Sequence, residues 1–256
     1  EKPCGIFCAM WIKVCGLKDP ENIREVAELA PQALGFIFSP ASPRYAGGLD
    51  PQVVRNLPPG TCRVGVFVDA PCEEVFETAR RYALDTVQLH GEESPAVCAA
   101  LRGAGLRVIK ACGVATREDL SAAEAYREVC DALLFDTKSP LRGGTGQRFD
   151  WDILAEYRGA LPFLLAGGLG PGDASRLARV VEHPACLGID LNSRFETAPG
   201  VKDVAALREF MAAVRGKAGD RQTSREEETK DRIDRTGKTR KNDKKYQDDE
   251  QTGKTI

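Results

Sequence analysis

Leu34-Gly35-Phe36-Ile37-Phe38 is a continuous apolar run, without the alternation of polar residues that marks a half-exposed strand. Such a run is typical of a strand covered on both faces, as in a parallel sheet. Seven further runs of this kind lie along the chain, and a segment with helical spacing of apolar residues follows each of the eight. We expect strands near 11–15, 33–38, 62–68, 85–89, 106–112, 131–136, 162–166 and 186–191, and helices near 20–30, 50–57, 72–83, 94–104, 117–128, 150–158, 171–182 and 202–215.

The order of these units predicts the fold. Strand–helix units in unbroken succession indicate an α/β protein, a (β/α)8 TIM barrel formed as a single domain by residues 11–216. A doubly wound open sheet is the alternative, but its G-x-G-x-x-G fingerprint is absent after the first strand. Residues 1–10 are expected to be an N-terminal lead-in. Residues 217–256 carry many charges and almost no apolar side chains, which predicts a disordered charged C-terminal tail.

The composition argues against several classes of protein. The 256 residues have a formal net charge of −2, which offers no excess of cations to a nucleic acid. No apolar run approaches the roughly 20 residues of a membrane helix, so we expect a cytoplasmic protein with no membrane partner. Nine scattered cysteines without a C-x-x-C pair favour reduced thiols. The spacing of Cys4 and Cys8 loosely resembles that of a pair of metal ligands, but no second pair of Cys or His accompanies them. We therefore expect no metal site.

Cys15 is the first candidate catalytic residue. It lies two residues after Lys13 at the end of the first run, so strand alternation points both side chains to one face. Ile12 and Val14 suit the layer beneath the helices, which leaves Lys13 and Cys15 facing the barrel interior. A neighbouring ammonium favours the thiolate, which would make Cys15 a base. An inert buried cysteine is the alternative interpretation.

Asp136 is the second candidate, because it ends the apolar run 132–135. Burial there raises the pKa of a carboxyl and keeps part of it protonated, so that it can donate a proton. A structural partner for Lys13 across the barrel is the alternative. Catalytic side chains of barrel enzymes sit at the C-terminal ends of the strands, and this favours the catalytic interpretation.

Three turns with little side-chain cover are candidates for binding phosphate. Bare backbone amides approach an anion closely, and two of the turns follow the seventh and eighth strands, where barrel enzymes commonly bind phosphate. The candidate residues are Gly144, Thr145 and Gly146 after the sixth strand, Gly167 and Gly168 after the seventh, and Asn192 and Ser193 after the eighth.

Three polar residues after the second and fourth strands are candidates for binding a substrate. Arg44 lies in a polar loop, where a guanidinium pairs with a carboxylate or a substrate oxygen, or is merely solvated. Gln88 and His90 close the fourth strand, where they either line the mouth of the barrel or satisfy nearby backbone groups.

Taken in order, these motifs strongly resemble those of the phosphoribosylanthranilate isomerase family. The likeness covers about residues 11 to 215, in seven segments with the family's order and spacing. The segments are 13–16 (KVCG), 35–38 with 42–45 (GFIF and SPRY), 64–67 (VGVF), 87–91 (VQLHG), 134–137 with 143–146 (LFDT and GGTG), 165–169 (LAGGL), and 188–190 leading to 199–203 (GID and PGVKD).

The resemblance implies an aldose–ketose isomerase of tryptophan biosynthesis that acts on a small phosphosugar without metal or organic cofactor, as a monomer or homodimer. It implies the Amadori rearrangement of N-(5-phosphoribosyl)anthranilate, with Asp136 as general acid and Cys15 as general base. The residue matching Arg44 is assigned to the anthranilate end. Gln88, His90 and Asp190 are expected to bind substrate, and the turns named above to bind the phosphate.

One departure and two alternatives accompany this interpretation. The family commonly has Ser-Ser-Gly after the eighth strand, whereas this chain has Asn192-Ser193-Arg194, so the loop differs in shape or adds a cation. A bifunctional isomerase that also accepts a histidine-pathway intermediate usually has aspartate where Cys15 stands. An inactive barrel that serves as a scaffold through its charged tail is the alternative from another class.

Overall fold

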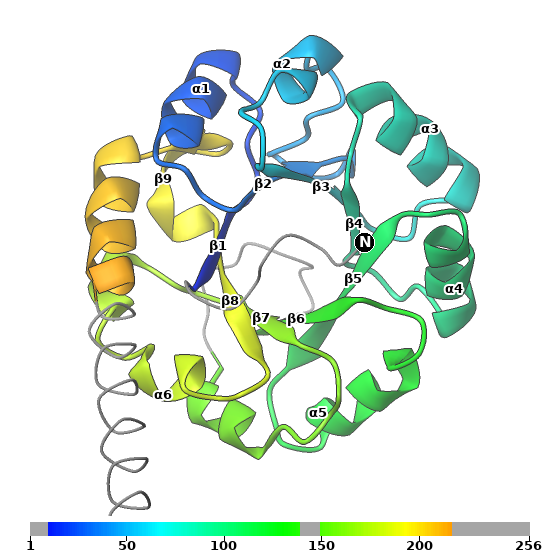
Figure 1. Cartoon of the computed structure of the whole chain (residues 1–256), viewed down its shortest axis with the longest axis vertical. Helices are drawn as coiled ribbons and strands as arrows, with labels where there is room; N and C mark the ends of the chain where they lie inside the picture. The colour runs from blue at the N-terminus through cyan, green and yellow to red at the C-terminus, as the bar shows by residue number, and fades with distance from the viewer. Residues whose placement is uncertain (1–9, 139–148, 217–256) are drawn as a thin grey trace, which may run out of the picture. The chain divides into compact units, whose positions relative to one another are not determined.

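A computed structural model describes residues 10–138 and 149–216, and the described part of the chain forms a closed barrel of eight parallel strands (Figure 1). Each strand pairs with its neighbours in sequence, and β1 closes the barrel against β8. The predicted (β/α)8 barrel is therefore confirmed. The strands are β1 (Trp11–Val14), β2 (Ala33–Ile37), β3 (Cys62–Phe67), β4 (Thr86–Leu89), β5 (Arg107–Val114), β6 (Ala132–Thr137), β7 (Phe163–Leu165) and β8 (Cys186–Leu191).

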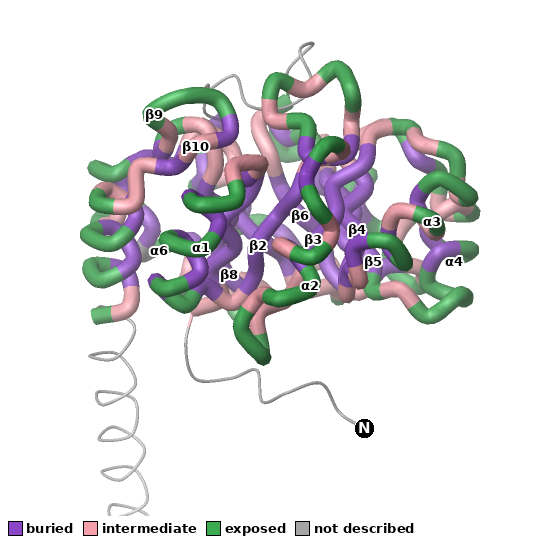
Figure 2. Tube along the Cα trace, turned by 90° about the horizontal axis from the view of Figure 1, so that it is seen from above, coloured by how far each residue is buried: buried purple, intermediate pink, exposed green. Residues whose placement is uncertain are grey.

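Helices surround the barrel, and their exposed outer faces contrast with the buried strands (Figures 1 and 2). Two of them begin with an aspartate followed by proline: the side chains of Asp19 and Asp50 cap the first turns of α1 and α2. The helices are α1 (Pro20–Glu28), α2 (Pro51–Arg55), α3 (Cys72–Tyr82), α4 (Pro95–Gly103), α5 (Asp119–Ala122), α6 (Ala178–Val181) and a helical segment at 204–216, with 3-10 turns η1 (Ala123–Tyr126), η2 (Trp151–Glu156), η3 (Pro171–Asp173) and η4 (Ser193–Phe195).

The second half of the barrel has shorter helical elements than the sequence predicts. The helix expected at 117–128 is split between α5 and η1, the one at 150–158 is the 3-10 turn η2, and the one at 171–182 is reduced to η3 and α6. At the last of these, glycine at 172 weakens the first turn, since it is a poor helix former. The hairpin of β9 (Glu196–Ala198) and β10 (Val201–Lys202) was not predicted. Its turn contains Gly200 at φ 88°.

The barrel interior is packed by alternate side chains of the strands. One buried apolar cluster comes from β5, β6 and the β7 region, and comprises Ile109, Ala111, Ala132, Leu134, Leu164 and Ala166. Residues 10–213 form one compact unit. The second unit, residues 1–9 and 214–256, lies almost wholly outside the described residues, and the predicted lead-in and tail fall there. No helix in the described ranges has the length and apolar character needed to cross a bilayer.

Candidate active site

Lys13 and Asp190 form a buried ion pair inside the barrel. They are register partners on β1 and β8, and Lys13 Nζ lies 2.9 Å from Asp190 Oδ2. The Lys13 side chain is fully buried. Burial lowers the pKa of Lys13, but Asp190 and Cys15 outweigh this and hold the pKa above its usual value. Lys13 is therefore a cation whose partner is Asp190, and the alternative pairing with Asp136 is wrong.

Cys15 lies directly after β1, where its backbone N–H donates to the Leu191 carbonyl at 2.8 Å and continues the β1–β8 ladder. Its side chain is buried, and Gly35 on β2 makes room for it. A Cβ at position 35 would lie 2.7 Å from Cys15 Sγ and 3.1 Å from Lys13 Cε. A glycine in the predicted apolar run of β2 is thus required by the close approach of the site residues.

Lys13 lowers the pKa of Cys15, as predicted for a neighbouring cation, but its effect is outweighed by burial in the free protein. Burial raises the pKa of the Cys15 thiol above its ordinary value of 9.0, and Lys13 and Lys202 only partly offset it. The charge of Lys13 is also shared with Asp190, which itself raises the pKa of Cys15. The resting side chain at neutral pH is the thiol.

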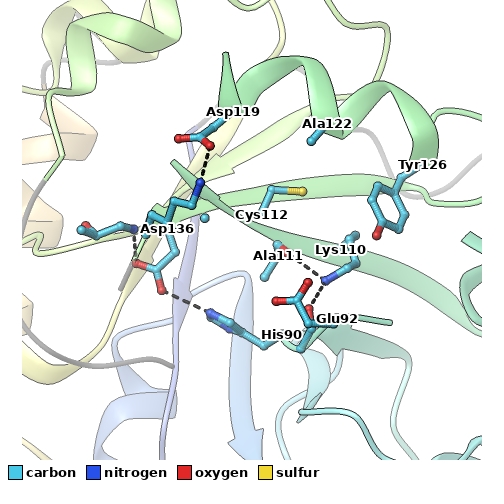
Figure 3. A pocket seen from close by; sticks show the side chains of 13 residues that line it. His90, Glu92, Lys110, Ala111, Cys112, Asp119, Ala122, Tyr126 and Asp136 are labelled. Atoms are coloured by element: carbon cyan, nitrogen blue, oxygen red, sulfur yellow. Dashed lines mark hydrogen bonds and ion pairs between the residues drawn. The ribbon is translucent and has the colours of Figure 1, made fainter. Parts of the chain in front are cut away.

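Asp136 belongs to β6, and neighbours on either side hold its carboxylate. Thr137 N donates to Oδ1 at 2.7 Å, and His90 Nε2 lies 3.3 Å from Oδ2 (Figure 3). His90 Nδ1 lies 3.0 Å from the amide nitrogen of Gln88, which can only donate, so Nδ1 accepts and Nε2 carries the proton toward Asp136. The Asp136 side chain is 19% exposed and thus less buried than predicted, because Asp136 lies beyond the buried 132–135 run.

A cavity of about 290 Å3 opens beside Asp136 at the ends of β4, β5 and β6. His90 and Asp136 line one part of it, and Lys110, Asp119 and Tyr126 line others (Figure 3). Cys15 is not among the residues that line this cavity. Burial raises the pKa of Asp190, the charge of Asp136 adds to that rise, and Asp190 in turn acts on Cys15.

Arg44 is paired with a carboxylate that the sequence analysis did not single out. Its Nε and Nη2 donate to the two oxygens of Glu196 at 2.7 to 3.0 Å. Glu196 also accepts from Lys202 Nζ at 2.6 Å, and the same ammonium donates to Asn192 Oδ1 at 2.8 Å. Lys202 lies in the 199–203 segment of the family likeness, which assigned it no role, and Glu196 lies outside every segment of that likeness.

The residues predicted to bind phosphate after the seventh and eighth strands lie in the loops that follow β7 and β8. Gly167 and Gly168 have φ values of 82° and 67°, a region that favours glycine. A Cβ at Gly167 would lie 2.5 Å from Thr137 Oγ1 and 3.1 Å from Asp136 Oδ1, so this turn packs directly against the candidate acid. Ser193 begins η4 after Asn192. Gly144, Thr145 and Gly146 lie outside the described residues.

Arg194 stands where the family commonly has glycine, and its side chain contacts the loop after β7. A Cβ at Gly170 would lie 2.7 Å from Arg194 Nε, so the Arg194 side chain lies along the loop after β7.

Across residues 10–138 and 149–216 we find no cluster of three or more His, Cys, Asp or Glu side chains that could hold a metal ion.

A closed (β/α)8 barrel with a thiol, a carboxyl and glycine turns at the ends of β1, β6 and β7 defines a TIM-barrel enzyme with its site at the C-terminal face. The family described as N-(5'-phosphoribosyl)anthranilate isomerase matches residues 12–213. The chain belongs to this family, and it is an isomerase of tryptophan biosynthesis.

Relatives and solved structures agree with this assignment. The chain is 46% identical to N-(5'-phosphoribosyl)anthranilate isomerase of Phocaeicola vulgatus over 81% of this chain and 99% of the relative. It is similar to the crystal structure of phosphoribosyl anthranilate isomerase from Thermotoga maritima, with a TM-score of 0.72, 34% identity, and coverage of 81% and 99% of the two chains. The crystal structure of the corresponding enzyme from Thermus thermophilus matches with a TM-score of 0.71 and 32% identity, and the match covers 80% of this chain and 98% of that chain.

Proposed function

We propose that the chain converts N-(5-phosphoribosyl)anthranilate into 1-(2-carboxyphenylamino)-1-deoxyribulose 5-phosphate, with Asp136 as general acid and Cys15 as general base. Asp136 protonates the ribose ring oxygen, and the C1–O bond breaks to give an open-chain Schiff base. Cys15 acts as its thiolate, which forms from the resting thiol by loss of the Sγ proton. The thiolate removes the proton from C2, and the resulting enolamine becomes the ketone as its hydroxyl proton is lost and C1 is protonated. Asp136 regains a proton and Cys15 releases one before the next turnover, so the net reaction is an isomerisation that needs no cofactor. The observation that supports the proposal is the placement of Cys15 directly after β1 and of Asp136 near the end of β6, both at C-terminal strand ends of one barrel.

The substrate contacts that we propose follow from the same geometry. Two buried acceptors, Gln88 Oε1 and Asp190 Oδ1, receive no hydrogen bond from the described residues, and they suit hydroxyl groups of the sugar. Arg44 is proposed to bind the anthranilate carboxylate, and His90 to contact the sugar beside Asp136. A solved relative with 33% identity and a TM-score of 0.69 is a complex with the reduced product, a phosphosugar. For the phosphate we propose Gly144, Thr145, Gly146, Gly167, Gly168, Asn192 and Ser193.

The test of this function is the loss of substrate fluorescence in wild type and in Cys15→Ser. We expect rapid turnover by the wild type and a kcat lower by about 10²- to 10⁴-fold in Cys15→Ser, because a hydroxyl is a far weaker base than a thiolate. Cys72→Ser, at the surface end of α3, is the matched control and should keep wild-type turnover. Equal kcat in all three proteins would remove Cys15 from the mechanism, and an inactive wild type would remove the proposed function.

The protonation state of Cys15 gives a second prediction. Because burial raises its pKa above 9.0, the thiolate should appear only at alkaline pH in the free enzyme. The pH titration of ultraviolet thiolate absorbance, taken as the difference between wild type and Cys15→Ser, should show its inflection above pH 9.0. An inflection near neutrality would show instead that Lys13 and Lys202 outweigh burial.

A further inference from the structure

The Arg44–Glu196 pair leaves one edge of the guanidinium unused. An arginine has five N–H donors, and Glu196 takes the edge formed by Nε and Nη2. Among the described residues, nothing accepts a hydrogen bond from Nη1. The edge formed by Nη1 and Nη2 has the spacing that binds a second carboxylate through two parallel hydrogen bonds. Glu196 therefore decides which way that free edge faces.

The charges around Glu196 keep Arg44 attractive to an anion. Lys202 Nζ lies 2.6 Å from Glu196 Oε1, and both side chains are nearly or fully buried. Burial raises the pKa of Glu196, but the hydrogen bonds of Arg44 and the charge of Lys202 outweigh this and hold the pKa below its usual value. Glu196 is thus a carboxylate between two cations, and the group of three retains one net positive charge.

Hydrogen bonds from α1 hold this group of three side chains in place beside the candidate base. Asn22 of α1 exchanges two hydrogen bonds with the backbone of Lys202, at 2.7 and 2.9 Å. A Cβ at Gly16 would lie 2.7 Å from Arg44 Cδ and 2.6 Å from Asn192 Oδ1. Since Gly16 directly follows Cys15, the backbone next to the thiol contacts the stem of Arg44 and the side chain that binds Lys202.

We propose that Glu196 is a positioning residue that aims the free edge of Arg44 at the carboxylate of an ortho-carboxyaryl aminosugar, with Lys202 preventing Glu196 from cancelling the positive charge. The inference rests on the proposed function and extends it to substrate selection. The hairpin β9–β10 then has a role: it carries Glu196 and Lys202 on adjacent strands, in register with one another.

The test is a thermodynamic cycle between the protein and the ligand carboxylate. The probes are the reduced product, 1-(2-carboxyphenylamino)-1-deoxyribitol 5-phosphate, and the same compound without the carboxylate. In wild type, removal of the carboxylate should weaken binding by roughly 10- to 100-fold. In Glu196→Gln, which keeps the size but loses the charge, this ratio should fall to about 3-fold or less, while the carboxylate-free probe binds nearly as in wild type.

Matched controls separate positioning from general destabilisation. Asp85 makes the same two-bond contact to Arg63, at 2.8 and 2.9 Å, near the N-terminal ends of β3 and β4. Asp85→Asn should keep the wild-type ratio. Glu196→Asp keeps the charge and should retain part of the ratio, which a purely structural role would not produce. In steady-state kinetics Glu196→Gln should raise KM more than it lowers kcat.

The outcomes distinguish this inference from the proposed function. If wild type isomerises the substrate and folded Glu196→Gln shows the full carboxylate ratio, the positioning role is wrong and the proposed function stands. If wild type neither turns over the substrate nor distinguishes the two probes, the proposed function itself is wrong. If Glu196→Gln does not fold, the same ratio is measured in Glu196→Asp. A ratio below that of the wild type supports the positioning role, and the full wild-type ratio contradicts it.

Discussion

Asp136→Asn should lower the kcat of isomerisation by about 10²- to 10⁴-fold and leave the barrel folded. An amide has nearly the shape of a carboxyl, but its N–H groups are far too weakly acidic to transfer a proton to the ribose ring oxygen. It also still accepts the hydrogen bond from Thr137 N, which now reaches Asp136 Oδ1 at 2.7 Å. The expected change is therefore in chemistry rather than in stability.

The same strand supplies the control for this variant. Asp131 precedes β6 at its opposite end, where it accepts from Val108 N at 2.8 Å and from Arg102 Nε at 3.2 Å. Asp131→Asn should reduce stability slightly and keep wild-type kcat, because it lies away from the C-terminal face. Fluorescence-monitored turnover and the thermal unfolding midpoint measure the two effects. An Asp136→Asn enzyme as active as Asp131→Asn would contradict the assignment of the acid.

His90 connects Asp136 to the fourth strand. In the free protein, His90 Nε2 lies 3.3 Å from Asp136 Oδ2, and His90 Nδ1 lies 3.0 Å from the amide nitrogen of Gln88. These contacts join the C-terminal ends of β4 and β6 beside the cavity, where the substrate is proposed to bind.

The strands could be predicted from the sequence because buried parallel strands leave a strong local signal. Both faces of β2 and of residues 64–67 in β3 are covered, so their apolar runs are interrupted only by glycines such as Gly35. The helices after β5, β6 and β7 were predicted less well. Their apolar residues have helical spacing, but the spacing alone does not distinguish an α-helix from consecutive 3-10 turns such as η1 and η2.

The position of Cys15 and Asp136 could be predicted, whereas the chemistry of their surroundings could not. Strand ends locate candidate groups, since all parallel strands end at one face of a barrel. The pKa of Cys15 depends on the balance between burial and three charges from β1, β8 and β10, and no local pattern gives that balance. The pairing of Arg44 with Glu196 likewise joins residues 152 positions apart.

The buried pair of Lys13 and Asp190 carries the largest expected effect on stability. Asp190→Leu should lower the free energy of unfolding by about 3–5 kcal/mol, because it leaves the Lys13 ammonium buried without a counter-charge. Lys13 is fully buried and its Nζ lies 2.9 Å from Asp190, so loss of that carboxylate removes its counter-charge without exposing it to water. Urea unfolding measures the change.

The double variant Lys13→Met/Asp190→Leu separates the value of the pair from the cost of an isolated charge. Replacing both charges by apolar side chains should restore part of the lost stability, since neither group then needs desolvation. An exposed pair offers the comparison: Arg179 and Asp152 lie 3.2 Å apart with side chains 80% and 59% exposed, and Asp152→Ala should change stability by about 1 kcal/mol or less.

The double variant should nevertheless be a poor enzyme, because Lys13 lowers the pKa of Cys15 and its loss makes the thiolate harder to form. If it were as stable and as active as wild type, the pair would serve neither folding nor catalysis. Stability without activity would instead show that the barrel keeps this ion pair for the reaction.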